Sequence, residues 1–107
     1  MRREFSVVLN EAAETAFAAL DGSDRRLVVK QLEKLRHNPE LGQPLGRNLV
    51  NYRKMYVAKK RIRVIYCIEP DGKLIVTVIA IGARDAGAVY AVAAAEANQR
   101  RRLRLIE

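Results

Sequence analysis

The sequence predicts an α+β fold in which an N-terminal strand, a helical hairpin and a three-stranded antiparallel meander precede a C-terminal helix. Three observations support this order. Apolar residues recur at helical spacing in the first third of the chain. Strand-forming residues alternate with cations from Tyr52 to Ile68, and an unbroken apolar run follows at Leu74–Ile81. Because 107 residues leave room for one hydrophobic core, we expect a single domain over residues 1–107.

The first two predicted elements are a strand over Arg3–Leu9 and a helix over Glu11–Leu20. Asn10 is suited to cap the helix, because its side chain can accept a bond from a free amide of the first turn. Asp21 and Gly22 are expected to end the helix. The apolar side chains that would face the core are Phe5, Val7 and Leu9 of the strand and Ala13, Ala16, Phe17 and Leu20 of the helix.

A second helix is predicted after this break, capped by Ser23 or Asp24. It should stop at Asn38, because a residue that precedes proline is displaced from the helical region. A short connection between two helices favours an antiparallel hairpin. The expected buried stripe consists of Val28, Leu32 and Leu35, with Leu27 beside them.

The segment Pro39–Leu49 is predicted to be a loop, since it holds two prolines and two glycines. Two strands joined by a short basic turn are expected next. In the second of them, alternation should place Ile62, Val64, Tyr66 and Ile68 on one face and Arg61, Arg63, Ile65 and Cys67 on the other.

The run Leu74–Ile81 is apolar at every position except Thr77, which is typical of a central strand covered on both faces. An alanine-rich helix is predicted from about Asp85. The chain then ends in a basic tail over residues 99–107.

Composition restricts the possible functions. Twenty Lys and Arg against twelve Asp and Glu give a formal charge of +8, which favours nucleic acid or an acidic protein as partner over a basic protein that binds no polyanion. No window resembles a membrane span or a secretory signal, so a cytoplasmic location is expected. The single cysteine, Cys67, is expected to be a buried apolar residue.

Six of the eleven residues from Arg53 to Arg63 are Lys or Arg. Such cations repel one another on a sheet surface unless a polyanion shares them, and we interpret that polyanion as RNA. The residues expected to contact RNA in this stretch are Arg53, Tyr56, Lys59, Lys60 and Arg61.

Several kinds of chemistry are not supported by the sequence. One histidine and one cysteine cannot form a zinc site, so no metal or other cofactor is expected, and His37 is expected at the surface. No phosphate loop, dinucleotide fingerprint or serine-hydrolase motif is present. Lys, Arg and Tyr remain as working groups. They suffice for RNA cleavage by its own 2′-hydroxyl, because arginine stabilises phosphorane charge and a lysine among cations can act as a base.

The ordered features resemble those of the RelE toxins of toxin–antitoxin modules. The resemblance runs from Phe5 to about Arg100 and rests on three pieces: N-P-x-x-G at Asn38–Gly42, a basic strand pair ending in R-V-I-Y, and G-A-R-D-A-G-A-V-Y after an apolar strand. It implies a RelE-like fold, messenger RNA cleaved in the ribosomal A site, and a cognate acidic antitoxin that masks the toxin in a hetero-oligomer.

The resemblance also implies roles for single residues. Arg63 matches the arginine that stabilises the transition state, and Arg84 matches the one that assists the leaving group. Tyr90 matches the tyrosine that stacks on or orients the nucleotide. Lys54 matches one of two lysines near the attacking hydroxyl. At the position of the second lysine this chain has Tyr56. The role of that lysine near the attacking hydroxyl could therefore fall to Tyr56, Lys59 or Lys60.

Other interpretations remain open at this stage. The chain could be a ParE-like toxin that binds DNA gyrase and has no nuclease activity, or a relative that binds only its antitoxin. The individual residues also have structural alternatives. Tyr66 is expected in the core, Tyr90 could pack the last helix, and Arg63 could pair with Glu69 or Asp71.

Overall fold

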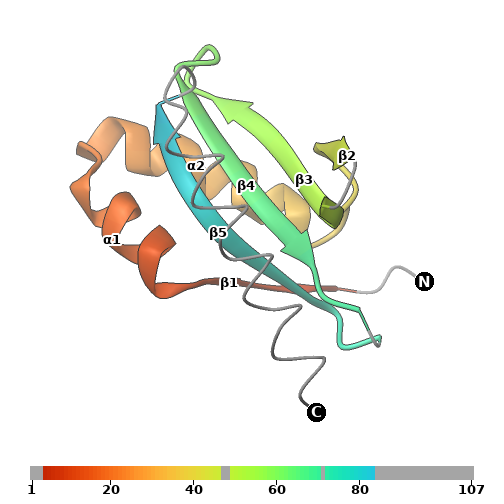
Figure 1. Cartoon of the computed structure of the whole chain (residues 1–107). Helices are drawn as coiled ribbons and strands as arrows, with labels where there is room; N and C mark the ends of the chain where they lie inside the picture. Colours follow the sequence, from red (N-terminus) through yellow and green to blue (C-terminus); the bar gives the residue numbers. More distant parts are fainter. Residues whose placement is uncertain (1–3, 47–48, 71, 84–107) are drawn as a thin grey trace.

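The computed structural model describes residues 4–46, 49–70 and 72–83 (Figure 1). The predicted order of strand, two helices and antiparallel meander is confirmed within this part. The elements are β1 (Ser6–Leu9), α1 (Glu11–Ala19), α2 (Gly22–Leu35), β2 (Gln43–Gly46), β3 (Leu49–Val57), β4 (Ile62–Ile68) and β5 (Ile75–Ala83). The predicted C-terminal helix from Asp85 and the basic tail over residues 99–107 lie outside the described residues.

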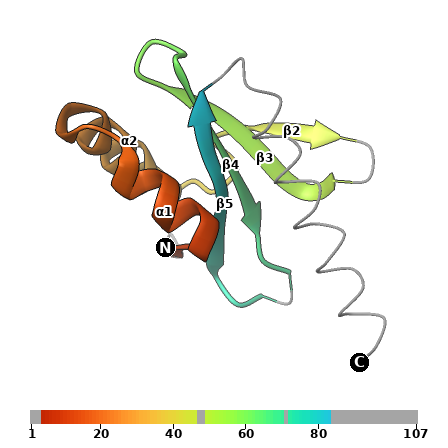
Figure 2. The same cartoon turned by 60° about the vertical axis from the view of Figure 1, so that its left-hand side comes forward.

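The strands form one sheet in the order β1-β5-β4-β3-β2. The meander β3-β4-β5 is antiparallel, whereas β1 pairs parallel with β5 through Ser6 and Ile75. Helices α1 and α2 cover one face of this sheet (Figure 2). The connection through the two helices therefore carries the chain from the edge strand β1 across to the far edge strand β2, and the opposite face of β3 and β4 is left without these helices.

The helix ends follow local capping chemistry. Asn10 accepts a hydrogen bond from the Ala13 amide at 2.8 Å, as predicted. The prediction that Ser23 or Asp24 caps α2 is wrong. The cap is Asp21, which accepts hydrogen bonds from the Asp24 amide and the Ser23 hydroxyl, each at 2.9 Å. These two hydrogen bonds lower the pKa of Asp21 below its usual value, and the bond from the Asp24 amide has the larger effect.

The main core lies between the helices and the sheet. It includes Val28, Leu32 and Leu35 of α2 and Met55, Val64 and Tyr66 of the hairpin. Leu27 does not join this stripe, because 42% of its surface is exposed. A second cluster lies on the other face of the sheet and contains Tyr52, Ile65, Cys67, Ile79 and Ala80. The predicted two-sided burial of the last strand and of Cys67 is therefore confirmed.

The segment predicted as a loop at Pro39–Leu49 contains a strand. β2 pairs antiparallel with β3 through Gln43 and Lys54, which is possible despite Pro44 because β2 is an edge strand. Tyr66 holds this segment in place. Its hydroxyl donates to the Pro39 carbonyl at 2.7 Å and accepts from the Gly42 amide at 2.8 Å. Burial raises the pKa of this phenol, so it stays protonated as a donor.

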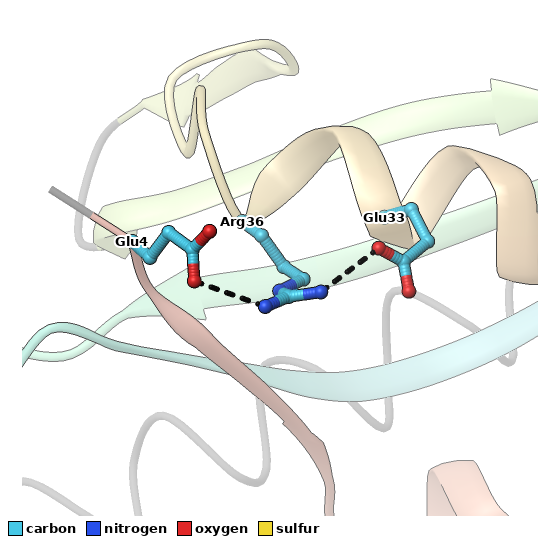
Figure 3. Close-up of polar contacts among 3 residues, drawn as sticks. All are labelled: Glu4, Glu33 and Arg36. Carbon is cyan, nitrogen blue, oxygen red and sulfur yellow. Dashed lines mark hydrogen bonds and ion pairs between the residues drawn. The ribbon is translucent and has the colours of Figure 1, made fainter. Parts of the chain in front are cut away.

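Arg36, at the end of α2, ties the helix to the start of the sheet. Its guanidinium contacts Glu4 at 3.0 Å and Glu33 at 3.2 Å (Figure 3). The Arg36 carbonyl also accepts a hydrogen bond from the Phe5 amide at 2.8 Å. All three charged side chains are well exposed, so each ion pair contributes at most about 1 kcal/mol. Neither of the two described helices is long and apolar enough to cross a membrane.

Gly42 gives a test of how β2 is held. A Cβ at this position would lie 2.5 Å from the Lys54 carbonyl oxygen and 2.8 Å from the Tyr66 hydroxyl oxygen. Gly42→Ala should therefore lower the free energy of unfolding by about 1–3 kcal/mol, because backbone and a buried ring must shift. Urea unfolding measures this change.

Gly22→Ala is the matched control. A Cβ on Gly22 would meet only the ends of two arginine side chains, the nearer at 3.8 Å. This change should be neutral or stabilise by up to about 1 kcal/mol, since alanine is the better helix former. Equal stability of the two variants would contradict the packing described for Gly42.

Candidate nucleic-acid interface

The register of β3 and β4 places three predicted site residues on one face. Tyr56 of β3 lies directly opposite Arg63 of β4, and Lys54 lies opposite Ile65. Because side chains two apart on a strand share a face, Lys54 and Tyr56 project to the same side. Met55 and Val64 pack into the core under the helices. The three polar side chains therefore belong to the face opposite α1 and α2.

These three side chains are in contact. The Arg63 guanidinium carbon is 5.6 Å from the centroid of the Tyr56 ring, and the Lys54 Nζ is 6.0 Å from it. Both distances lie within the range of attraction between a cation and an aromatic ring. All three residues are partly buried, so part of each side chain is open to a ligand.

The two cations change the acidity of the phenol between them. Burial by itself would raise the pKa of Tyr56, but hydrogen bonding with Arg63 and the charges of Lys54 and Arg63 outweigh it and lower the pKa below 10.0. The anionic form is favoured because it gains both cations as partners. Tyr56 therefore releases its proton more readily than an isolated tyrosine does.

The turn after β3 has an unusual backbone. Ala58, Lys59 and Lys60 all adopt positive φ, at 56°, 55° and 69°. The Arg61 amide donates to the Ala58 carbonyl at 3.1 Å and closes the turn. A left-handed conformation costs a residue with a side chain roughly 1–2 kcal/mol. The strained turn holds two exposed lysines at the end of the hairpin.

A groove of about 610 Å³ separates this turn from α2. Leu27, Lys30, Gln31 and Lys34 line it from the helix, and residues 56–60 line it from the hairpin. Lys30 and Lys34 are cations that the sequence analysis did not single out. Their spacing of four residues on a predicted helix was the available signal, because it places both on one helix face. With Lys59 and Lys60 they make the groove strongly basic.

Two predicted contact residues are engaged elsewhere. Arg53 projects away from the Tyr56 face, and its guanidinium donates to the Gly42 carbonyl at 2.6 Å and the Glu40 carbonyl at 3.3 Å. Arg61 pairs with Asp24 of α2 at 3.0 Å. Both cations therefore make contacts that stabilise the fold. Arg61 is still largely open to solvent near the groove, because 63% of its side chain is exposed.

The ion pair between Arg63 and Glu69 that the sequence analysis considered possible is not formed. The two residues lie at opposite ends of β4, about 20 Å apart at roughly 3.3 Å per residue. Glu69 instead accepts a hydrogen bond from the Thr77 hydroxyl at 2.5 Å. On β5, Gly82 is the residue opposite Arg63. Asp71, Arg84 and Tyr90 lie outside the described residues.

The described residues hold no group of three or more His, Cys, Asp or Glu side chains that could bind a metal ion. His37 is exposed near the end of α2. The partly exposed polar side chains described on this face of β3 and β4 are thus two cations and a phenol. They can bind a phosphate, stabilise negative charge that develops on it, and exchange a proton.

The comparisons with known proteins agree with this fold. No protein-family model matches the chain, and a search of curated proteins finds no match. Solved structures do match. A free double arginine-to-alanine mutant of the Escherichia coli toxin RelE superposes with a TM-score of 0.76 at 22% identity, covering 87% of this chain and 97% of that chain.

Two toxin–antitoxin complexes also match. The intact Escherichia coli RelBE complex has a TM-score of 0.67 at 21% identity, covering 77% of this chain and 99% of that chain. The RelBE2 complex of Mycobacterium tuberculosis has a TM-score of 0.65 at 21% identity, covering 78% and 95%. At these identities the match establishes a RelE-like fold.

The strained turn can be tested with two variants of Lys60. Lys60→Gly and Lys60→Gln both remove the charge, but only glycine adopts φ near +69° without a steric penalty. The glycine variant should be about 1 kcal/mol more stable than the glutamine variant in urea unfolding. Equal stabilities, or a more stable glutamine variant, would contradict the left-handed conformation of this turn.

Proposed function

We propose that this chain is the toxin of a toxin–antitoxin pair and cleaves messenger RNA in the ribosomal A site. The reaction is attack of the RNA 2′-hydroxyl on the adjacent phosphorus, without a metal ion. The observation that carries the proposal is the contact of Tyr56 with Lys54 and Arg63 on the face of a RelE-like sheet opposite α1 and α2. These residue types supply what the reaction requires at a phosphate.

Each residue has a role in this proposal. Arg63 donates from its planar guanidinium to the non-bridging oxygens and stabilises the phosphorane. Lys54 lies near the attacking hydroxyl, and its charge favours the alkoxide. Arg84 assists the leaving 5′-oxygen and Tyr90 orients the nucleotide. These last two follow Gly82 in the sequence, and Gly82 lies opposite Arg63.

The basic surface beyond the three central residues would hold the flanking RNA. Lys59 and Lys60 are exposed, and with Lys30 and Lys34 they line the groove next to Tyr56. Phosphate contacts of this kind add affinity without reading the sequence. Arg61, Arg53 and the phenol of Tyr56 would complete the contact surface.

We further propose a cognate antitoxin that is acidic. Two of the structural neighbours are toxins solved with their antitoxins. The formal charge of +8 on this chain would attract an acidic protein by the same electrostatic complementarity that attracts RNA. An antitoxin that covers the cations would then block access of RNA to Lys54 and Arg63.

Arg63→Ala is the direct test of the nuclease. It removes the main donor to the phosphorane and should lower the cleavage rate by roughly 10²–10³-fold, so growth arrest on induction should be lost. Mapping transcript ends should show cyclic phosphates and 5′-hydroxyls for the original chain only. Lys73→Gln is the charge-matched control, since Lys73 is exposed in the connection between β4 and β5.

Two outcomes would contradict this proposal. One is full growth arrest by an Arg63→Ala variant whose circular dichroism shows a native fold. The other is arrest by the original chain with intact transcripts and loss of DNA supercoiling, which indicates gyrase as the target.

Ionic strength tests the RNA surface separately. Binding to a single-stranded RNA made uncleavable by 2′-O-methyl groups should weaken as salt rises, with a log–log slope of about −0.7 per phosphate contact. The double variant Lys59→Gln/Lys60→Gln should make the slope shallower by about 1.4 if each lysine contacts one phosphate. Lys73→Gln should leave it unchanged. An unaltered slope in the double variant would remove these lysines from the surface.

A further inference from the structure

Cleavage through the 2′-hydroxyl needs a group that accepts its proton, and the structure limits the choice. Two carboxylates near the hairpin are engaged elsewhere: Asp24 with Arg61, and Glu69 with Thr77 at the far end of β4. His37 is exposed beyond the end of α2. Tyr52 and Tyr66 are buried, so Lys54, Lys59, Lys60 and Tyr56 are the acceptors that remain to be compared among the described residues of the hairpin.

Position separates these four residues. Lys59 and Lys60 belong to the exposed turn that follows β3, beyond the residues of β3 that pair with β4. Lys54 lies opposite Ile65, two positions along β3 from the residue that faces Arg63. Tyr56 alone lies directly opposite Arg63, and Lys54 approaches its ring from two residues away on the same strand. A phosphate held by Arg63 would therefore have the phenol as its immediate neighbour.

Two cations favour the anion of Tyr56. Lys54 approaches its ring from the same strand and Arg63 from β4, whereas the groove lined by Lys59, Lys60, Lys30 and Lys34 faces α2. The described lining of that groove contains no carboxylate. The pKa of the phenol is accordingly lowered. Lys54 and Arg63 thus stabilise both a phenolate and a bound phosphate.

We propose that Tyr56, as its phenolate, accepts the proton of the attacking 2′-hydroxyl. This proposal rests on the proposed nuclease function. The 2′-oxygen bonds to phosphorus as its proton passes to the Tyr56 Oη. The bond from phosphorus to the 5′-oxygen breaks, and the 5′-oxygen leaves with the electron pair and takes a proton from water. The products are a 2′,3′-cyclic phosphate, a 5′-hydroxyl, a neutral Tyr56 and a hydroxide, which removes the phenol proton for the next turnover.

The first arm of the test measures the phenol without any substrate. Phenolate absorbance is recorded against pH for the original chain and for Tyr56→Phe, and the difference isolates Tyr56 from the other three tyrosines. The difference curve should have its midpoint below pH 10, the ordinary value for tyrosine. Lys54→Gln keeps the phenol and removes one cation, so it should move the midpoint to higher pH.

The second arm measures cleavage of ribosome-bound messenger RNA as a function of pH. The rate should rise tenfold per pH unit below the Tyr56 midpoint and level off above it, because only the phenolate accepts the proton. Tyr56→Phe should lose about a hundredfold or more of the plateau rate and lose this rise. Lys54→Gln should shift the pH at which the cleavage rate levels off by the same amount as it shifts the midpoint of the absorbance curve. Tyr52→Phe removes a hydroxyl from the same strand and should retain the rise.

The outcomes distinguish this proposal from the nuclease itself. Cleavage by Tyr56→Phe with the original rate and pH profile overturns the role of Tyr56 and leaves the nuclease intact. A midpoint at or above pH 10, or a Lys54→Gln profile that does not follow its midpoint, also overturns it. If the original chain does not cleave RNA on or off the ribosome, the proposed function fails and this proposal fails with it.

Discussion

The antiparallel register of β3 and β4 is the constraint on which the candidate site depends. It sets Tyr56 opposite Arg63 and brings Lys54 to the same face. A slip of one residue would move Arg63 into the core under the helices and Val64 to the opposite face, because side chains alternate along a strand. Burial of Val64, Tyr66 and Met55 beneath the helices prevents that slip. The apolar side of the hairpin thus fixes the positions of its cationic side.

The same hairpin carries destabilising features that the fold has to offset. Six cations crowd eleven positions, and three consecutive residues of the turn have positive φ. The structure offsets part of this through Asp24, which pairs with Arg61, and through the carbonyls that accept from Arg53. Lys59 and Lys60 remain exposed near Lys30 and Lys34. Strain and like charge kept together at one end of a molecule are typical of a site shaped by its ligand.

Local patterns predicted the elements well, because alternation and helical spacing report which face of each segment is buried. These local patterns gave wrong predictions where the structure of a segment depends on a residue distant in the sequence. β2 was missed since Pro44 indicates a loop, and only pairing with Lys54 makes it an edge strand. Asp21 was assigned to the break between the helices although it caps α2. The contact of Tyr56 with Arg63 required the cross-strand register, which the sequence pattern alone does not give. The positions expected for Arg84 and Tyr90 remain predictions.

A phenol and a lysine differ as proton acceptors among cations. Repulsion lowers the pKa of a lysine, which must lose its proton before it can act as a base, and its neutral amine then has little attraction for its neighbours. A tyrosinate instead attracts Lys54 and Arg63 and keeps them close while no RNA is bound. When a phosphate arrives it competes for the same two cations, and the phenolate loses part of its stabilisation. Its basicity therefore rises at the moment when the 2′-hydroxyl is next to it, so substrate binding itself would drive the proton transfer.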